Sequence, residues 1–152
     1  MTESKRRKGR TLGVDLGIKR TGLGLSDELG LTTRALETLK PKSRAEDIAY
    51  ILSLVDEFEV KRVVFGLPLL TQSGEDSPMT RRARRFARAF YEARQARDCL
   101  VVLVDEAHSS REASERLVAS GVKKTERKAR LDGEAACIII ERYWEGAKEE
   151  SF

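Results

Sequence analysis

The sequence is poor in the residues that build disulfide frameworks, zinc sites and membrane spans. It has 2 cysteines and 1 histidine, too few and too scattered for a disulfide scaffold or a zinc cluster. Cys99 and Cys137 are therefore expected to be small buried apolar residues. His108 is expected at the surface or at a helix cap, with a general-base role as the alternative.

Long apolar segments are also absent. No run approaches the roughly 18 residues of a membrane-spanning helix. The polar and basic first residues lack the apolar segment of a signal peptide. These absences predict a cytoplasmic protein that does not contact a membrane.

Length and charge describe one domain with a well-hydrated surface. The chain has 152 residues, 40% hydrophobic and 36% charged, which is typical of a single globular domain. We expect a disordered basic arm over residues 1–10, one domain over residues 11–146 and a tail over residues 147–152. The net charge is only +4, so the distribution of basic residues says more about partners than their number.

Apolar and glycine spacing predicts an α/β fold. Three glycine-punctuated runs indicate an antiparallel meander, two later runs indicate buried strands, and helical periodicity separates and follows them. This order predicts a mixed five-stranded sheet, a three-strand meander plus two parallel strands, flanked by helices. The predicted strands are 11–15, 21–26, about 32–39, 62–65 and 100–104, and the predicted helices are 44–58, 78–95, 109–120 and about 132–144.

Acidic residues are expected to converge at one edge of this sheet. Asp15 ends the first strand, and Asp105 and Glu106 end the last one, where sites form in open α/β sheets. Asp132 opens the final helix, whose apolar face has two small alanines and packs closely on the sheet. Because neighbouring strand residues point to opposite faces, only one of the paired acids joins the site. We favour Glu106, with Asp105 as the alternative.

Converging carboxylates resist being ionised together. Divalent Mg²⁺ or Mn²⁺ relieves the repulsion, since hard cations prefer oxygen ligands. Two such ions about 4 Å apart stabilise the attacking and leaving oxygens of a phosphodiester. We therefore interpret Asp15, Glu106 and Asp132 as catalytic metal ligands. The alternative is that they are separate turn and helix-start residues.

Basic residues gather in three segments suited to a phosphate backbone. One is a row opposite the apolar stripe of the helix 78–95, another is the turn after Asp15, and the third lies between the last two helices. The alternative is a set of solvated basic surfaces. The predicted nucleic-acid contacts are Lys19, Arg20, Arg81, Arg84, Arg85, Arg88, Lys123 and Lys124.

The motifs, taken in order over about residues 11–145, resemble the YqgF (RuvX) family of Holliday-junction-resolvase-like nucleases, which have a ribonuclease-H-like fold. The family begins with an Asp-x-Gly-x-Lys-Arg-x-Gly turn and a following Ser-Asp pair. It continues with Gly-Leu-Pro, an Asp-Glu-Arg strand end and Asp-x-x-Ala-Ala. These motifs fall on Asp15, Gly17, Lys19, Arg20, Gly22, Ser26 and Asp27, on Gly66, Leu67, Pro68 and a following Gly74, on Asp105 and Glu106, and on Asp132, Ala135 and Ala136.

The sequence departs from the family at one place, where Ala107 replaces the arginine of the strand end. If that arginine holds phosphate, another basic group must substitute. Arg111, one helical turn further on, is one candidate, and Lys19 with Arg20 is another.

The resemblance implies a metal-dependent nuclease that processes the 5′ end of pre-16S rRNA in ribosome biogenesis. The alternatives are a resolvase of branched DNA and a nucleic-acid-binding module without catalysis. An actin-like sugar kinase or ATPase shares the Asp-x-Gly turn, but it needs two lobes for which this chain is too short. We expect structured RNA or branched DNA as the partner, and both a monomer and a homodimer stay open.

Overall fold

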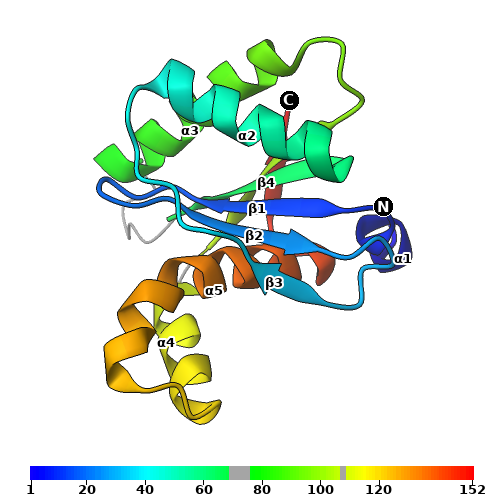
Figure 1. Ribbon diagram of the computed structural model, residues 1–152. Coiled ribbons are helices and arrows are strands. Elements are labelled where there is room, and N and C mark those ends of the chain that lie inside the picture. The colour runs from blue at the N-terminus through cyan, green and yellow to red at the C-terminus, as the bar shows by residue number, and fades with distance from the viewer. Residues whose placement is uncertain (69–75, 107–108) are drawn as a thin grey trace.

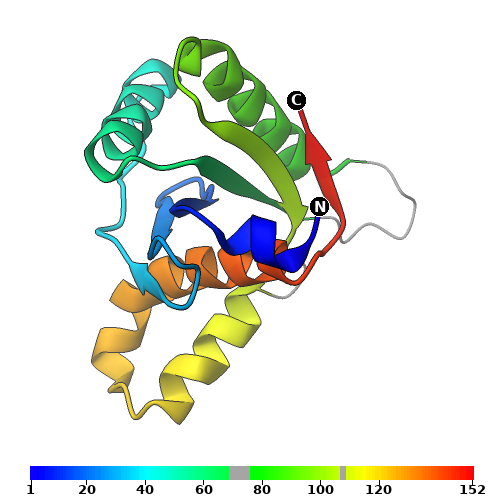
Figure 2. The same ribbon diagram turned by 90° about the vertical axis from the view of Figure 1, so that its right-hand side faces the viewer.

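A six-stranded mixed sheet forms the centre of the molecule, with helices on both faces (Figures 1 and 2). This computed structural model describes residues 1–68, 76–106 and 109–152. The spatial strand order is β3-β2-β1-β4-β5-β6, with β1, β4 and β5 parallel and the other strands antiparallel to their neighbours. The strands are β1 (Thr11–Asp15), β2 (Gly22–Ser26), β3 (Thr33–Ala35), β4 (Arg62–Leu67), β5 (Leu100–Asp105) and β6 (Glu149–Ser151).

The helices divide between the two faces of the sheet. Helices α2 and α3 lie together on one face, and α5 lies on the other, where it forms a projecting hairpin with α4 (Figures 1 and 2). None of the helices in the described ranges is both long and apolar enough to cross a membrane. The helices are α1 (Glu3–Arg7), α2 (Arg44–Phe58), α3 (Pro78–Arg94), α4 (Ser109–Ala119) and α5 (Lys124–Trp144).

Local sequence signals fix where α2 and α3 begin. Ser43 accepts a hydrogen bond from the Glu46 N–H, and the Glu46 carboxylate accepts one from the Ser43 N–H, a reciprocal capping box. Ser77 accepts from the Thr80 N–H, and Pro78 occupies the first helical position. Both helices therefore start at the residues that the sequence predicts, beside the carboxyl edge of the parallel strands.

Side chains of the central strands alternate between two apolar clusters. Phe65 and Leu103 belong to the cluster under α2 and α3. Val64, Val102 and Val104 belong to the cluster under α5. Both faces of β4 and β5 are thus buried, as expected for parallel strands covered by helices on each side.

Helix α5 approaches β1 and β2 with almost no side-chain layer between them. A Cβ on Gly13 would overlap the backbone oxygen of Ala136, and one on Gly24 would lie 3.0 Å from the Cys137 nitrogen. Ala135 and Ala136 are both buried in this contact. The close approach carries the middle of α5 to the sheet edge.

Two predictions for the later part of the chain need correction. The sheet has six strands rather than five, because part of the predicted tail, residues 149–151, pairs with β5 as β6. Helix α5 begins at Lys124 rather than near Asp132, so the basic segment expected to be a connector forms its first turns. This segment lacks an apolar stripe, so the sequence carries no periodic signal of its helical form.

The predicted disordered arm, residues 1–10, contains the short helix α1 instead. Arg6 donates a hydrogen bond to the Tyr143 carbonyl oxygen at 3.3 Å, and the Arg7 guanidinium lies 4.6 Å from the centre of the Trp144 ring. These partners lie at the far end of the chain. Local composition therefore could not reveal them.

The contact between Gly13 and α5 leads to a stability prediction. We expect Gly13→Ala to lower the free energy of unfolding by about 2 kcal/mol, because the added methyl group overpacks a contact with helix backbone. Urea denaturation should show a lower midpoint with an unchanged m-value. Ala119→Ser, at an exposed position of α4, serves as control and should change stability by about 0.5 kcal/mol or less. Equal midpoints for the two variants would contradict the prediction.

Candidate active site

Three acidic side chains meet at the carboxyl edge of the sheet, on the face covered by α5. Asp15 ends β1 and pairs across the strands with Gly22. A Cβ on Gly22 would overlap the backbone oxygen of Asp132, so α5 rests on that strand directly beside Asp15. The glycine on β2 thus allows a strand carboxylate and a helix carboxylate to become neighbours.

Glu106 joins this pair from β5. Its N–H donates to the Leu67 carbonyl oxygen at 3.0 Å, which continues the strand ladder by one residue. A Cβ on Gly66 would lie 2.7 Å from the Glu106 carboxyl carbon and 2.6 Å from an Ile139 methyl group. The Glu106 carboxyl group therefore lies over β4 on the α5 face.

Asp105 has the opposite orientation. Strand side chains alternate, and Val102 and Val104 pack under α5 while Val101 and Leu103 pack under α2 and α3. By this alternation, the Asp105 side chain lies on the same face as Val101 and Leu103, the face covered by α2 and α3. The geometry thus brings Glu106, and not Asp105, to Asp15.

Asp15 is in direct contact with Glu106 through a side-chain hydrogen bond. Burial raises the pKa of Asp15, and the nearby charge of Asp132 raises it further, while the bond with Glu106 acts in the opposite direction. Asp15 is therefore a carboxyl group whose charged form is disfavoured by its surroundings.

The negative charge of Asp132 is compensated by an arginine on the turn between β1 and β2. The Arg20 Nε lies 3.0 Å from the Asp132 Oδ2. The same oxygen is buried and accepts no hydrogen bond of good geometry from any described residue, so the arginine acts mainly through its charge. Arg20, predicted to contact phosphate, is held by a carboxylate in this state.

The acids do not form a preformed metal cage. Within the ranges that the structure describes, no three His, Cys, Asp or Glu side chains are arranged to hold an ion. Asp15 instead has Glu106 as its hydrogen-bond neighbour, and Asp132 has Arg20. What the site offers is a set of oxygen donors on three different elements.

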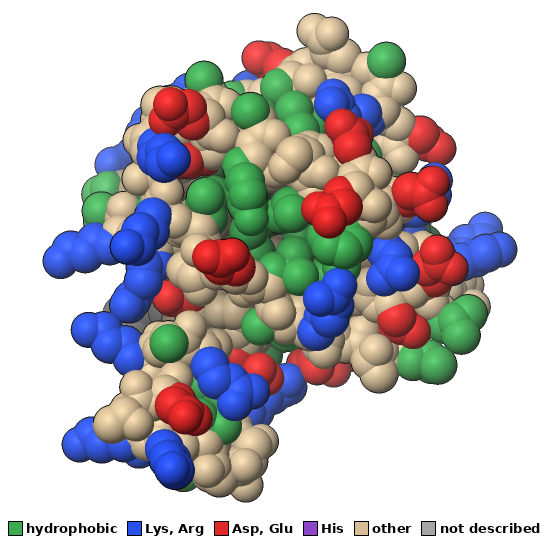
Figure 3. All heavy atoms as spheres, viewed as in Figure 1, with side chains coloured by type: hydrophobic (Ala, Val, Ile, Leu, Met, Phe, Trp, Pro, Cys, Tyr) green, Lys and Arg blue, Asp and Glu red, His purple; other side chains and the backbone are tan. Residues whose placement is uncertain are grey.

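Basic side chains crowd the same edge, at the left of Figure 3. The row predicted on α3 is only partly available, however. Arg84 pairs with Asp76 and Glu150, and Arg81 donates to the Asp76 carbonyl oxygen at 2.7 Å.

The other predicted basic residues have mixed surroundings. Arg88 lies 3.8 Å from the Glu92 carboxylate, whereas Arg85 lines a hollow between α2 and α3. Lys19, Lys123 and Lys124 are exposed.

Three basic residues of that hollow are not among the predicted nucleic-acid contacts: Lys42, Arg44 and Arg82. Lys42 and Arg44 flank the cap of α2, and Arg82 lies within the arginine-rich segment of α3. Each is therefore a basic residue that the sequence shows near the start of a helix. Only the packing of α2 on α3 brings the three side chains to one hollow.

The remaining sequence predictions concern single residues. Cys99 and Cys137 are buried free thiols as predicted, and burial raises the pKa of each to about 11. Arg111 pairs with Glu115 at 3.3 Å on the exposed side of α4 and does not turn toward the acids. Gly74, Ala107 and His108 lie outside the described residues.

The raised pKa of Asp15 predicts a pH-dependent effect of Asp15→Asn. Between its ordinary value of 3.8 and the raised one, the folded protein binds more protons than the unfolded chain, so this carboxyl group lowers stability as the pH rises through that window. We expect Asp15→Asn to raise the unfolding temperature at pH 7 in EDTA. At pH 3 the difference should vanish, because Asp15 is then protonated in both states.

The control is Asp56→Asn, which removes an exposed carboxylate whose pKa is lowered by its bond with Arg97. This substitution should leave the unfolding temperature at pH 7 unchanged or reduce it. A fall for Asp15→Asn equal to that of the control would contradict the prediction. Differential scanning calorimetry at both pH values provides the measurement.

Comparison with known proteins gives consistent results. A family model described as "RuvX: Holliday junction resolvase" matches residues 9–146. A protein of Anaeromyxobacter dehalogenans named "Putative pre-16S rRNA nuclease" is 42% identical over 132 residues, which are 87% of this chain and 93% of the relative. A protein of the same name from Syntrophus aciditrophicus is 38% identical over 141 residues, which are 93% of this chain and 91% of the relative.

Solved structures support the fold. T. thermophilus RuvC in complex with a Holliday junction substrate has a TM-score of 0.59 at 18% identity and covers 93% of this chain and 99% of its own. The fowlpox virus Holliday junction resolvase has a TM-score of 0.57 at 14% identity, with 90% and 98% covered. The fold is therefore that of these resolvases, and since the family model spans nearly the whole sequence, the chain belongs to the RuvX family, as its motifs predicted.

Proposed function

We propose that this protein is a nuclease that hydrolyses phosphodiester bonds with a divalent cation held by Asp15, Glu106 and Asp132. The observation that carries the proposal is the convergence of these carboxyl groups, from two strands and a helix, at one edge of the sheet. Placing acids together in a partly buried site costs stability, and a bound cation would offset that cost. Membership of the RuvX family and the names of its relatives support the same activity.

The residues present fit a divalent cation. Hard cations prefer carboxylate oxygens, and within the described ranges the Asp132 Oδ2 is a buried oxygen that accepts no hydrogen bond. A bound Mg²⁺ or Mn²⁺ would polarise the phosphodiester and lower the pKa of the attacking water. We extend the proposal to two ions, because Mg²⁺ usually takes only one or two carboxylates and three are available here.

The chain's own residues have distinct tasks in this proposal. Asp15, Glu106 and Asp132 would hold the cation through their carboxylate oxygens. The charge of Asp132 would then no longer depend on its ion pair with Arg20. The Arg20 guanidinium, on the exposed turn between β1 and β2, would be available for a phosphate of the substrate.

For the substrate we propose the 5′ extension of pre-16S rRNA, the molecule named for the relatives from two bacterial genera. The second candidate is a four-way DNA junction, which the description of the family favours. Both substrates present a phosphate backbone, so the same carboxylates and basic residues serve either reaction.

The activity is tested on a single-stranded RNA extension and a four-way DNA junction, each with Mg²⁺, Mn²⁺ or EDTA. We expect cleavage only with a cation, and we expect Glu106→Gln to reduce its rate by about 100-fold or more, as for loss of an electrostatic stabiliser. Asp105→Asn is the matched variant on the other face of β5 and should cleave nearly as the unaltered protein. Binding without cleavage under every condition would refute the nuclease, and a larger loss for Asp105→Asn would refute the choice of Glu106.

The second task of Arg20 is tested by binding. We expect Arg20→Ala to weaken RNA binding in the presence of Ca²⁺ by about fivefold, the loss of one charge-assisted contact worth about 1 kcal/mol. Lys61→Ala removes an exposed charge at the opposite edge of the sheet and should have no such effect. Fluorescence anisotropy measures both affinities, and an unchanged affinity for Arg20→Ala would rule out the phosphate contact.

A further inference from the structure

We propose that a basic hollow beside the carboxylate edge binds a phosphate group of the nucleic-acid strand. The source of that phosphate rests on the proposed function, but the site itself rests on its own residues. The hollow has a volume of about 390 Å³ and lies where α2 and α3 begin. Its walls include Ile18, Lys42, Arg44, Asp47, Arg82 and Arg85.

The hollow has a strong excess of positive charge. Four cations face one acid, Asp47, whose Oδ1 already accepts a hydrogen bond from the Lys42 N–H at 3.0 Å. None of the four cations forms an ion pair with any residue in the described ranges. On the same helix, Arg84 has both Asp76 and Glu150 as partners. The contrast indicates that, among the described residues, Asp47 alone does not balance the positive charge of the hollow.

Arg82 gives the most direct indication of a ligand. Its Nη1 is buried and has no hydrogen-bond partner among the residues that the structure describes. A buried donor without an acceptor is unfavourable, whereas a guanidinium fork matches phosphate oxygens well. The N-terminus of α2 is already capped by Ser43, so the binding capacity comes from side chains rather than from the helix end.

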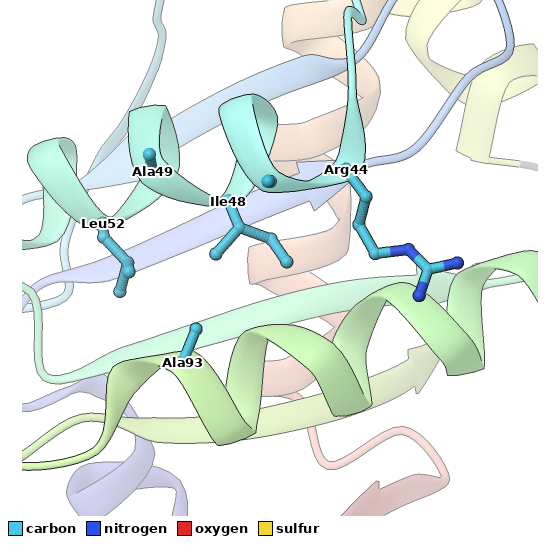
Figure 4. Close-up of a pocket in the computed structure, with 6 residues that line it drawn as sticks. Arg44, Ile48, Ala49, Leu52 and Ala93 are labelled. Atoms are coloured by element: carbon cyan, nitrogen blue, oxygen red, sulfur yellow. The ribbon is translucent and has the colours of Figure 1, made fainter.

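The position of Arg44 completes the hollow. Figure 4 shows an apolar groove between α2 and α3, with the Arg44 guanidinium extending from the start of α2 toward α3. Arg44 lines both the groove and the hollow. It therefore closes the basic hollow on the side of the groove.

The turn between β1 and β2 connects the hollow with the carboxylates. Ile18, on this turn, lines the hollow and is 71% exposed, while Arg20 reaches Asp132 on the other face of the sheet. A strand that crosses this turn can place one phosphate in the hollow and another at the acids. The hollow would thus position the strand for cleavage without contacting the reacting phosphate.

The test compares two double variants that each remove two positive charges. Arg82→Gln/Arg85→Gln alters the hollow, and Lys8→Gln/Lys61→Gln alters exposed lysines at the opposite edge of the sheet. The probes are short single-stranded RNAs with a 3′ fluorophore, one with a 5′-phosphate and one with a 5′-hydroxyl group. Anisotropy is measured in EDTA over a series of salt concentrations, and thermal unfolding verifies that each variant is folded.

We expect the hollow variant to bind about 10-fold more weakly, with the slope of log Kd against log salt reduced by about 0.7 for each phosphate that the variant no longer neutralises. The lysine variant should retain its affinity and slope. Arg82→Lys, which keeps the charge but not the guanidinium fork, should fall between them. Weaker binding of both RNAs assigns the hollow to an internal phosphodiester, and weaker binding of the 5′-phosphorylated RNA alone assigns it to the terminal phosphate.

Equal reductions of affinity in the two double variants would overturn the proposal that the hollow binds a phosphate group, because the loss of positive charge anywhere on the surface would then account for the weaker binding. Absence of RNA binding by the unaltered protein would overturn the hollow as a site for this strand and the choice of RNA as the substrate of the nuclease. A protein that binds RNA through the hollow but never cleaves would keep the hollow and refute the nuclease. If the unaltered protein cleaves RNA and the hollow variant binds RNA with unchanged affinity, the nuclease is supported and the hollow is refuted.

Discussion

The close packing of α5 on β1 and β2 is the constraint on which the site depends. Gly13, Gly22 and Gly24 place no side chain between these strands and α5 where they cross, so the helix backbone rests on the strand backbone. The same glycines bring Asp132 beside Asp15. A larger residue at Gly22 would separate the two acids and displace the helix, which couples the packing of this face to the chemistry of its edge.

Electrostatics determines how the edge is held together in the absence of a cation. Asp15 and Glu106 share a hydrogen bond, and Asp132 is compensated by Arg20. The ion pair with Arg20 offsets part of the negative charge that these partly buried carboxyl groups present. Arg20 lies on an exposed turn, so its side chain can leave Asp132 without unfolding the protein.

The two faces of the sheet contribute opposite charges to one edge. The acids lie on the α5 face, and the basic hollow lies on the face of α2 and α3. The turn between β1 and β2 runs between them, with Ile18 on one side and Arg20 on the other. A polyanionic strand crossing this turn meets positive charge before it meets the carboxylates, an arrangement that reduces the repulsion from the acids.

The sequence by itself determined the order of the elements, the bounds of α2 and the positions of the acids, because capping residues, periodicity and strand ends are local signals. It left Glu106 and Asp105 undecided, because β5 is apolar on both faces and shows no alternation. It also missed α1, β6 and the basic hollow. Only the tertiary structure decided these features, since each depends on contacts between segments far apart in the chain.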